Sequence, residues 1–190
     1  MTELTWHADN IETIANFFST AECEDYIRLG EQMGFEEATL FAPRSVKDYR
    51  NNDRVIVDDT ERAQGLYQRL AGHLAPSFQH RWQPVGLNER LRLYRYDVGQ
   101  KFEWHRDGHF ERDDGERSQF TFMIYLNDDF EGGTTSFCDD TGLMPDGPLR
   151  ITPEKGMALL FHHPIMHRGD PVTKGRKYVL RTDVMYRRSR

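Results

Sequence analysis

The stretch FEWHRDGHF, residues 102–110, contains two side chains that bind metal ions, His105 and, two residues later, Asp107. First-row transition metals accept imidazole nitrogen and carboxylate oxygen, and two histidines with one carboxylate can occupy one face of an octahedron. Such a site leaves three adjacent positions open for small molecules. Because side chains two residues apart on an extended strand point to the same side, both residues can reach one ion.

The same spacing occurs at His7 and Asp9, near the start of the chain. We expect these residues to precede a helix, which Asp9 or Asn10 would cap, and we assign no metal to them. His-x-Asp alone therefore does not identify a site, and a third ligand is needed.

Three histidines in FHHPIMHRGDPV, residues 161–172, are candidates for that third ligand. His162 and His163 end an apolar segment that is typical of a strand, where they could be buried and hydrogen-bonded. His167 lies four residues further along. Position alone does not choose among the three.

The segment KYVLRTDVMY, residues 177–186, follows after glycine and proline turns, and a hairpin there would bring Lys177 beside His167. Alternation places Lys177, Arg181 and Asp183 on one face of a strand. If that face points inward, the cations need an anion, because an unpaired buried charge is costly. The alternative is that the face meets solvent.

The elements that would position these residues change in type along the chain. The first third predicts helices, one with a capping box from Ser19 to Glu22 and an end near Gly34, and one after Asp58 and Asp59. The rest is rich in β-formers, separated by turn residues. Strands are expected at 91–96, 118–126, 131–137, 156–163 and 177–186. Strands without intervening helices indicate an antiparallel sandwich or barrel, supported by the helices from one side.

Composition limits the classes of function. A chain of 190 residues with 12% aromatic side chains can bury a core, which argues for a single domain and against disorder. A net charge of −6 disfavours nucleic acid as a partner. We find no signal peptide and no segment long enough to span a membrane. The two distant cysteines argue against a disulfide scaffold and favour a cytoplasmic setting.

From about residue 87 to the end, the chain resembles the iron(II)- and 2-oxoglutarate-dependent oxygenases of the prolyl 4-hydroxylase type. Four elements occur in the family's order: YRYDVGQKFEWHRD, TFMIYLNDDFEGGTTSF, P-x-x-G-M-A-L-L-F, and H-R-G-D-P-V-x-x-G-x-K. Each is weak evidence alone, but together they cover roughly half of the chain.

The resemblance implies an α+β, mainly β fold: a double-stranded β-helix, or jelly-roll, with N-terminal supporting helices. Residues 1–190 would form one oxygenase domain, with helical support and lid segments in 1–85 and the β-helix core with the iron site in 86–190. Within 1–85, residues 50–59 would cover the active site or form a polar surface turn.

The resemblance also implies roles for individual residues. The iron ligands would be His105, Asp107 and His167. Lys177 would hold the 5-carboxylate of 2-oxoglutarate, and hydroxyl groups of Tyr96, Thr121 and Tyr125 would assist. Arg181 is an additional inward cation, which would reach 2-oxoglutarate or, as we prefer, a polar or acidic substrate.

The implied activity is hydroxylation of an unactivated C–H bond of a peptidyl, prolyl-like residue or of a small amino-acid-like molecule. Succinate and CO2 would be released, with Fe(II), 2-oxoglutarate and O2 as cofactors and ascorbate as reductant. The main alternative is a non-catalytic module of the same fold that senses 2-oxoglutarate or iron. A zinc hydrolase or cupin-like isomerase is a third hypothesis, but it gives no reason for the element behind His167. The sequence names neither the substrate nor an oligomeric state.

Overall fold

The computed structural model describes residues 2–38, 48–138 and 147–189. The elements before the central strands are β1 (Glu3–Ala8), β2 (Ile11–Ala15), α1 (Thr20–Met33), β3 (Glu36–Glu37), β4 (Asp53–Asp58), α2 (Thr60–Leu70) and a 3₁₀ turn (Ala71–His73). Next come β5 (Trp82–Leu87), β6 (Arg90–Tyr96), β7 (Phe102–His105), β8 (Arg117–Tyr125), β9 (Glu131–Gly132) and β10 (Thr135–Cys138). The last are β11 (Leu149–Ile151), β12 (Ala158–His162), β13 (Met166–Gly169), β14 (Val172–Lys174) and β15 (Lys177–Arg188).

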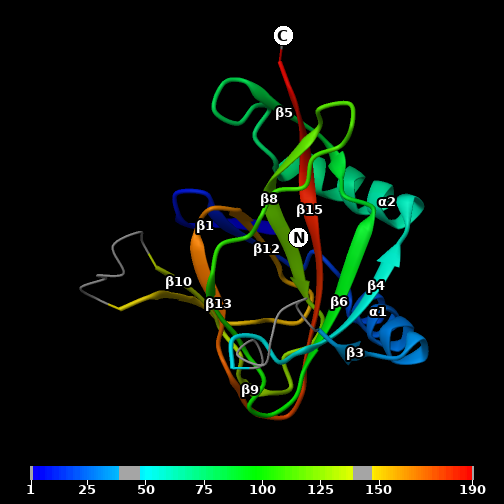
Figure 1. The fold of residues 1–190 in the computed structure, drawn as a ribbon, viewed down its shortest axis with the longest axis vertical. Helices are drawn as coiled ribbons and strands as arrows, with labels where there is room; N and C mark the ends of the chain where they lie inside the picture. The colour runs from blue at the N-terminus through cyan, green and yellow to red at the C-terminus, as the bar shows by residue number, and fades with distance from the viewer. Residues whose placement is uncertain (1, 39–47, 139–146, 190) are drawn as a thin grey trace.

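Two antiparallel sheets carry the fold. Within the described residues, the larger has the order β1-β2-β12-β8-β15-β6-β4-β3, with β5 paired to β15 as its ninth strand. The smaller has the order β11-β10-β13-β7, and β14 pairs with β9 in a short ribbon. Figure 1 shows β10 and β13 on one side of the large sheet and both helices on its other side. The predicted jelly-roll with supporting helices is confirmed.

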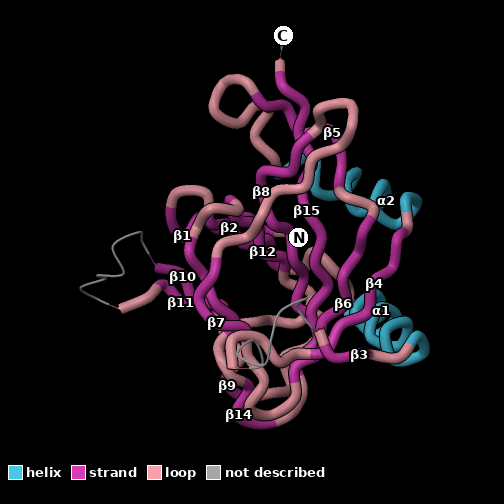
Figure 2. Tube along the Cα trace, viewed as in Figure 1, coloured by secondary structure: helices cyan, strands magenta, loops and turns pink. Residues whose placement is uncertain are grey.

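Strand alternation divides the core into two layers. On β6 and β8, Leu91, Leu93, Phe122 and Ile124 pack with the helices in one buried cluster. The alternate residues of the same strands, such as Tyr94, belong to the cluster between the two sheets. Figure 2 shows the helices only on the outer side of the large sheet. The inner layer therefore receives every second side chain of β6, β8 and β15.

Local signals explain where the helices begin and end. Ser19 accepts a hydrogen bond from the Glu22 amide while Glu22 reaches back to the Ser19 amide, which confirms the predicted capping box. Gly34 ends α1 at a positive φ of 83°, and Asp59 caps α2. No helix of the described residues combines the length and the apolar character needed to cross a membrane.

The first 85 residues contribute more strands than we predicted. Instead of a helix after His7, the chain forms the β1–β2 hairpin, which joins the large sheet through β12. Asn10, at the turn, adopts a positive φ of 61°, a conformation that asparagine tolerates. Residues 53–58 form β4, paired to β6, so most of the expected lid segment is a strand of the main sheet.

Gly156, two residues before β12, contacts Phe18 in the segment between β2 and α1. Its carbonyl accepts from the Phe18 amide at 2.9 Å, its φ is +80°, and a Cβ there would lie 2.2 Å from the Phe18 carbonyl oxygen. We expect Gly156→Ala to lower the free energy of unfolding by at least about 2 kcal/mol, measured by urea denaturation. Gly65→Ala on α2, where a Cβ meets no atom within 4 Å, should instead raise it by about 0.5–1 kcal/mol. Equal midpoints for Gly156→Ala and the parent chain would contradict this prediction.

Candidate metal centre

Three metal-binding side chains meet between the two sheets. His105 ends β7, Asp107 follows two residues later, and His167 lies in β13, where it pairs directly with His105 across the ladder. One ligand atom from each residue lies within 4.8 Å of the other two. Asp107 carboxylate oxygens lie 3.7 Å from His105 Nε2 and 3.6 Å from His167 Nε2. All three side chains are less than a tenth exposed.

The ring orientation of both histidines suits metal binding. The Nδ1 atom of His105 lies 2.7 Å from the Glu103 carbonyl oxygen, and that of His167 lies 2.9 Å from the Ile165 carbonyl oxygen. A carbonyl oxygen only accepts, so Nδ1 carries the proton and donates in each ring. Each Nε2 therefore keeps a lone pair, directed towards Asp107, as a metal ligand requires.

The ionisation of the three groups matches the same requirement. Burial, together with the neighbouring His167, lowers the pKa of His105 to about 3, and burial also lowers the pKa of His167. Burial by itself raises the pKa of Asp107, but the Arg181 guanidinium and the two imidazoles hold it below its ordinary value. Near pH 7 the site thus offers two neutral imidazoles and one carboxylate, the donor set expected for Fe(II).

A chain of hydrogen bonds holds Asp107 from behind. Thr121 Oγ1 donates to Asp107 Oδ2 at 2.5 Å. Since Thr121 uses its only proton there, His163 Nδ1–H donates to Thr121 at 2.9 Å, and His163 Nε2 accepts from the Ser118 hydroxyl at 2.9 Å. Ser118 in turn accepts from the Phe110 amide. His163, which we considered as a third ligand, therefore lies behind the carboxylate.

We expect Thr121→Val to weaken metal binding. Valine keeps the approximate shape of the side chain but loses the hydrogen bond to Asp107 and leaves His163 Nδ1–H without its acceptor. The dissociation constant for Mn(II), measured by calorimetry, should rise roughly 10- to 100-fold. Thr5→Val, at an exposed position of β1, is the matched control and should bind as the parent chain does. Parent-like affinity in Thr121→Val would show that the hydroxyl does not orient the carboxylate.

The three metal-binding side chains line a pocket, and Lys177 lines it too, without a counter-ion among the described residues. Its side chain is buried, with 3% exposure, and its Nζ donates to the Gly133 carbonyl oxygen at 2.6 Å. The rings of Tyr96 and Tyr125 lie 5.4 and 5.2 Å from the ammonium group, and burial lowers its pKa to about 7. In the part of the chain that the structure describes, no carboxylate lies within ion-pair distance of this lysine. A dicarboxylate that entered the pocket could supply the missing charge.

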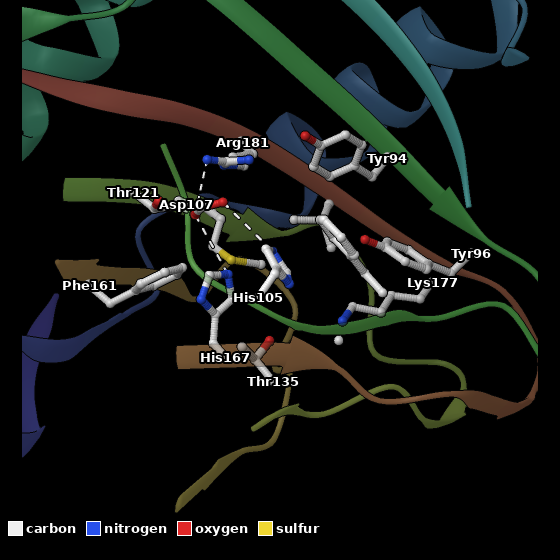
Figure 3. Close-up of a pocket in the computed structure, with 14 residues that line it drawn as sticks. Tyr94, Tyr96, His105, Asp107, Thr121, Thr135, Phe161, His167, Lys177 and Arg181 are labelled. Carbon is white, nitrogen blue, oxygen red and sulfur yellow. Dashed lines mark hydrogen bonds and ion pairs between the residues drawn. The ribbon is translucent and has the colours of Figure 1, made fainter. Parts of the chain in front are cut away.

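Arg181 is already paired. Its guanidinium lies 3.0 Å from Asp107 Oδ2 and 3.3 Å from Asp183 Oδ1, and Asp183 also pairs with Arg92 at 3.2 Å. Figure 3 shows Arg181 on the Asp107 side of the pocket and Lys177 at the opposite side. Arg181 thus lines the pocket and contacts a candidate metal ligand, and its contact with a substrate or with 2-oxoglutarate stays a prediction.

The remaining predicted residues separate into two groups. Tyr96 and Thr121 line the pocket with the three metal-binding residues, Lys177 and Arg181. Tyr125 does not line it, because its hydroxyl is fully buried and bonded to Thr135 at 2.7 Å. The hairpin expected to bring Lys177 beside His167 is absent from the described residues. Lys177 pairs instead with Tyr96 of β6. Lys177 and His167 therefore face the pocket from different sheets.

Phe102 and Arg50 add to the site beside the candidate ligands. Phe102 stacks on His105 with ring centroids 3.5 Å apart, and buried Arg50 lies over the Phe102 ring at 4.4 Å. The Arg50–Phe102 bridge attaches the segment before β4 to β7. No spacing in the sequence indicates that contact, which spans 52 positions.

Comparison with known proteins gives consistent results. Residues 91–182 match the model of the 2OG-Fe(II) oxygenase superfamily. Probable prolyl 4-hydroxylase 11 of Arabidopsis thaliana is 41% identical over 78 residues, which cover 41% of this chain and 26% of that protein. Prolyl 4-hydroxylase 1 of the same plant is 26% identical over 172 residues, covering 83% and 59%. The chain thus spans less than two thirds of the length of these relatives.

Solved structures share the fold. The viral collagen prolyl hydroxylase of Paramecium Bursaria Chlorella virus-1, in its 2OG complex, superimposes with a TM-score of 0.64 at 21% identity, covering 93% of this chain and 96% of that one. A prolyl hydroxylase of Trichoplax adhaerens, in complex with a hypoxia inducible factor peptide fragment, gives a TM-score of 0.67 at 19% identity, covering 93% and 84%. These structures support the fold, and the family match over residues 91–182 together with the plant relatives confirms the resemblance that the sequence predicts.

Proposed function

Because the chain is related to the iron(II)- and 2-oxoglutarate-dependent oxygenases of the prolyl 4-hydroxylase type, we propose that it hydroxylates an unactivated C–H bond. The substrate is a peptidyl, prolyl-like residue or a small amino-acid-like molecule, and succinate and CO2 are released. One observation carries the proposal: two imidazoles, one carboxylate and an unpaired buried lysine line a single pocket.

His105, Asp107 and His167 would hold the metal through two nitrogen atoms and one oxygen atom. Lys177 would bind the far carboxylate of 2-oxoglutarate through a charge-assisted hydrogen bond, which fixes the orientation of that molecule. When bound, Fe(II) with 2-oxoglutarate and O2 supplies the oxidising chemistry, and ascorbate serves as the reductant. We propose that residues 1–190 act as one unit in this reaction.

The rest of the pocket keeps the ligand groups in place. Thr121 and Arg181 both contact Asp107 Oδ2, which favours the other carboxylate oxygen as the metal ligand. Phe161 packs against His167 with ring centroids 4.5 Å apart, and Phe102 stacks on His105. These rings exclude water from the imidazoles and restrict their rotation.

The test is succinate release by the purified chain with Fe(II), ascorbate and 2-oxoglutarate, across a panel of proline-containing peptides, free amino acids and other small metabolites. We expect slow release without substrate, faster release with at least one class of the panel, and a product heavier by one oxygen atom. A sensor would bind 2-oxoglutarate tightly and release no succinate with any member. That result would overturn the proposed activity.

A further inference from the structure

A second pocket adjoins the first, and Lys177 does not line it. Its lining residues lie at the start of β8, at the end of β12, in the segment after β7 and in the segment that leads into β5. Figure 1 labels β5, β8 and β12. Asp107 lines both pockets. The outer pocket, as we name it, has a cavity volume of about 270 Å³, compared with about 40 Å³ for the inner one. The inner pocket suits an ion and a slender cosubstrate, whereas the outer pocket has room for a substrate side chain.

A bulge in β8 directs polar groups into the outer pocket. Val184 of β15 pairs with Phe120 and the next residue, Met185, pairs with Ser118, so Gln119 has no opposite residue on β15. Such a bulge redirects side chains, and bulges are frequent next to active sites. Both Ser118 and Gln119 consequently line the pocket, together with Arg117.

Two buried donors in this pocket lack acceptors. Gln119 is 8% exposed, and neither its Nε2 nor the Nε of Arg117 has a hydrogen-bond partner, although both atoms are buried. A buried donor without an acceptor lowers the stability of the folded chain. Because both groups are N–H donors, the ligand that satisfies them must present acceptors.

The charge of the outer pocket indicates which acceptor. Arg117 donates to His109 Nδ1 at 3.2 Å and Arg81 donates to Gln79 Oε1 at 3.4 Å, and neither arginine forms an ion pair within the described ranges. Asp107 is the one acidic residue among the described lining residues, and Arg181 already pairs with it. The pocket therefore has two guanidinium groups without a counter-charge.

We propose that the outer pocket binds a carboxylate of the substrate through Arg117, Gln119 and Arg81, so that the enzyme selects an acidic group close to the residue it hydroxylates. This inference rests on the proposed function and names its substrate class. At about 3.3 Å per residue along β8, Gln119 lies about 7 Å from Thr121 and Arg117 about 13 Å. An extended peptide advances about 3.5 Å per residue, and these distances are upper limits because the bulge shortens the strand, so the carboxylate lies up to about four residues from the reacting position.

Direct binding tests the proposal without turnover. The full chain, loaded with Mn(II) and 2-oxoglutarate so that the inner pocket is filled, is titrated by calorimetry with three peptides. Ac-Pro-Glu-NH2 carries a side-chain carboxylate, Ac-Pro-Gln-OH carries a terminal one, and Ac-Pro-Gln-NH2 is the neutral reference. We expect at least one acidic peptide to bind at least tenfold more tightly than the reference, and the stronger of the two identifies the source of the carboxylate.

Variants then assign the preference to the pocket. Arg117→Met should reduce the preference for the acidic peptide to less than threefold, and Arg81→Met should weaken that preference. The control is Arg28→Met, which should leave the preference unchanged, because Arg28 is an exposed residue of α1 that pairs with Asp25. Arg117→Glu should favour Ac-Pro-Lys-NH2 over Ac-Pro-Glu-NH2, a gain that a misfolded chain cannot give. Equal binding of the three peptides, no binding of any, or a preference that survives both methionine variants would overturn the proposal.

The two proposals can fail separately. Acid-selective binding that depends on Arg117, in a chain that releases no succinate, would support the outer pocket and refute the oxygenase activity. Succinate release that is equal with acidic and neutral substrates, without acid-selective binding, would support the oxygenase activity and refute the role of the outer pocket.

Discussion

Asp107→Ala is expected to abolish succinate release and to raise the dissociation constant for Mn(II) at least roughly a thousandfold. Asp107 is the one anionic donor of the set and the nearest carboxylate to both imidazoles. Its removal also leaves Arg181 with only Asp183 as a partner, so the pocket becomes more positive where a cation must bind. Calorimetry with Mn(II) gives the affinity, and circular dichroism verifies the fold.

The chain supplies a matched control for this substitution. His7 and Asp9 repeat the His-x-Asp spacing, but Asp9 lies in an exposed turn between β1 and β2. Asp9→Ala should therefore bind metal and release succinate as the parent chain does. If Asp107→Ala retained metal affinity within tenfold of the parent, the assigned ligand set would be wrong.

Lys177→Met is expected to weaken 2-oxoglutarate binding roughly a hundredfold, because a charge-assisted hydrogen bond to a buried group contributes about 1.5–3 kcal/mol. The corresponding change at Arg181 should have a smaller effect, since that guanidinium is occupied by Asp107 and Asp183. A double-mutant cycle between the two positions measures whether they act on the same carboxylate. A larger effect at Arg181 than at Lys177 would transfer the anchor to Arg181.

The affinity should also depend on pH. Burial lowers the pKa of free Lys177 to about 7, and a bound carboxylate raises it again. Below pH 7 the lysine is already charged and the dissociation constant is flat. Above pH 7, binding takes up a proton, so the constant rises towards tenfold per pH unit. Lys177→Arg keeps its charge throughout and should remove this slope in titrations between pH 6 and 9.

The lowered pKa of Lys177 also affects the free energy of unfolding of the ligand-free chain. Above pH 7 the folded chain has lost the Lys177 proton, while the unfolded chain keeps it up to the ordinary lysine value of 10.5. The unfolded state then binds more protons, so this residue makes the free energy of unfolding rise with pH across that window. Lys177→Met should remove that contribution and stabilise the ligand-free chain near pH 7, which denaturation at several pH values would measure.

Much of the fold could be predicted because its signals are local. Alternation in LRLYRY and KYVLRTDVMY identifies β6 and β15 and places Lys177 and Arg181 on one face, and the structure shows that this face lines the pocket. The capping residues of both helices were equally readable. By contrast, β1 and β2 have weak individual signals, and their partner β12 lies about 145 positions away. Asn10 in a two-residue turn was the available indication of that hairpin.

The candidate site was only partly predictable for the same reason. His105 and Asp107 are close in sequence, but the choice of His167 over His162 and His163 depends on the pairing of β13 with β7, which no local pattern encodes. The ion pair between Arg181 and Asp107 likewise joins β15 to the segment that follows β7, and it depends on side-chain length and rotamer. Residue types could indicate that a cation lies inside, but not which carboxylate it would meet.

β15 has a consequence for how such a protein can change over time. Lys177 and Arg181 lie on one uninterrupted strand that pairs with β6 and β8 on its two sides, so their separation is fixed at four residues, about 13 Å. Inserting or deleting one residue between them would send one of the two cations to the helix-covered side and lose it from the interior. Lineages of this chain can therefore acquire new preferences by exchanging side chains or by lengthening loops, whereas the length of this strand segment is closed to variation.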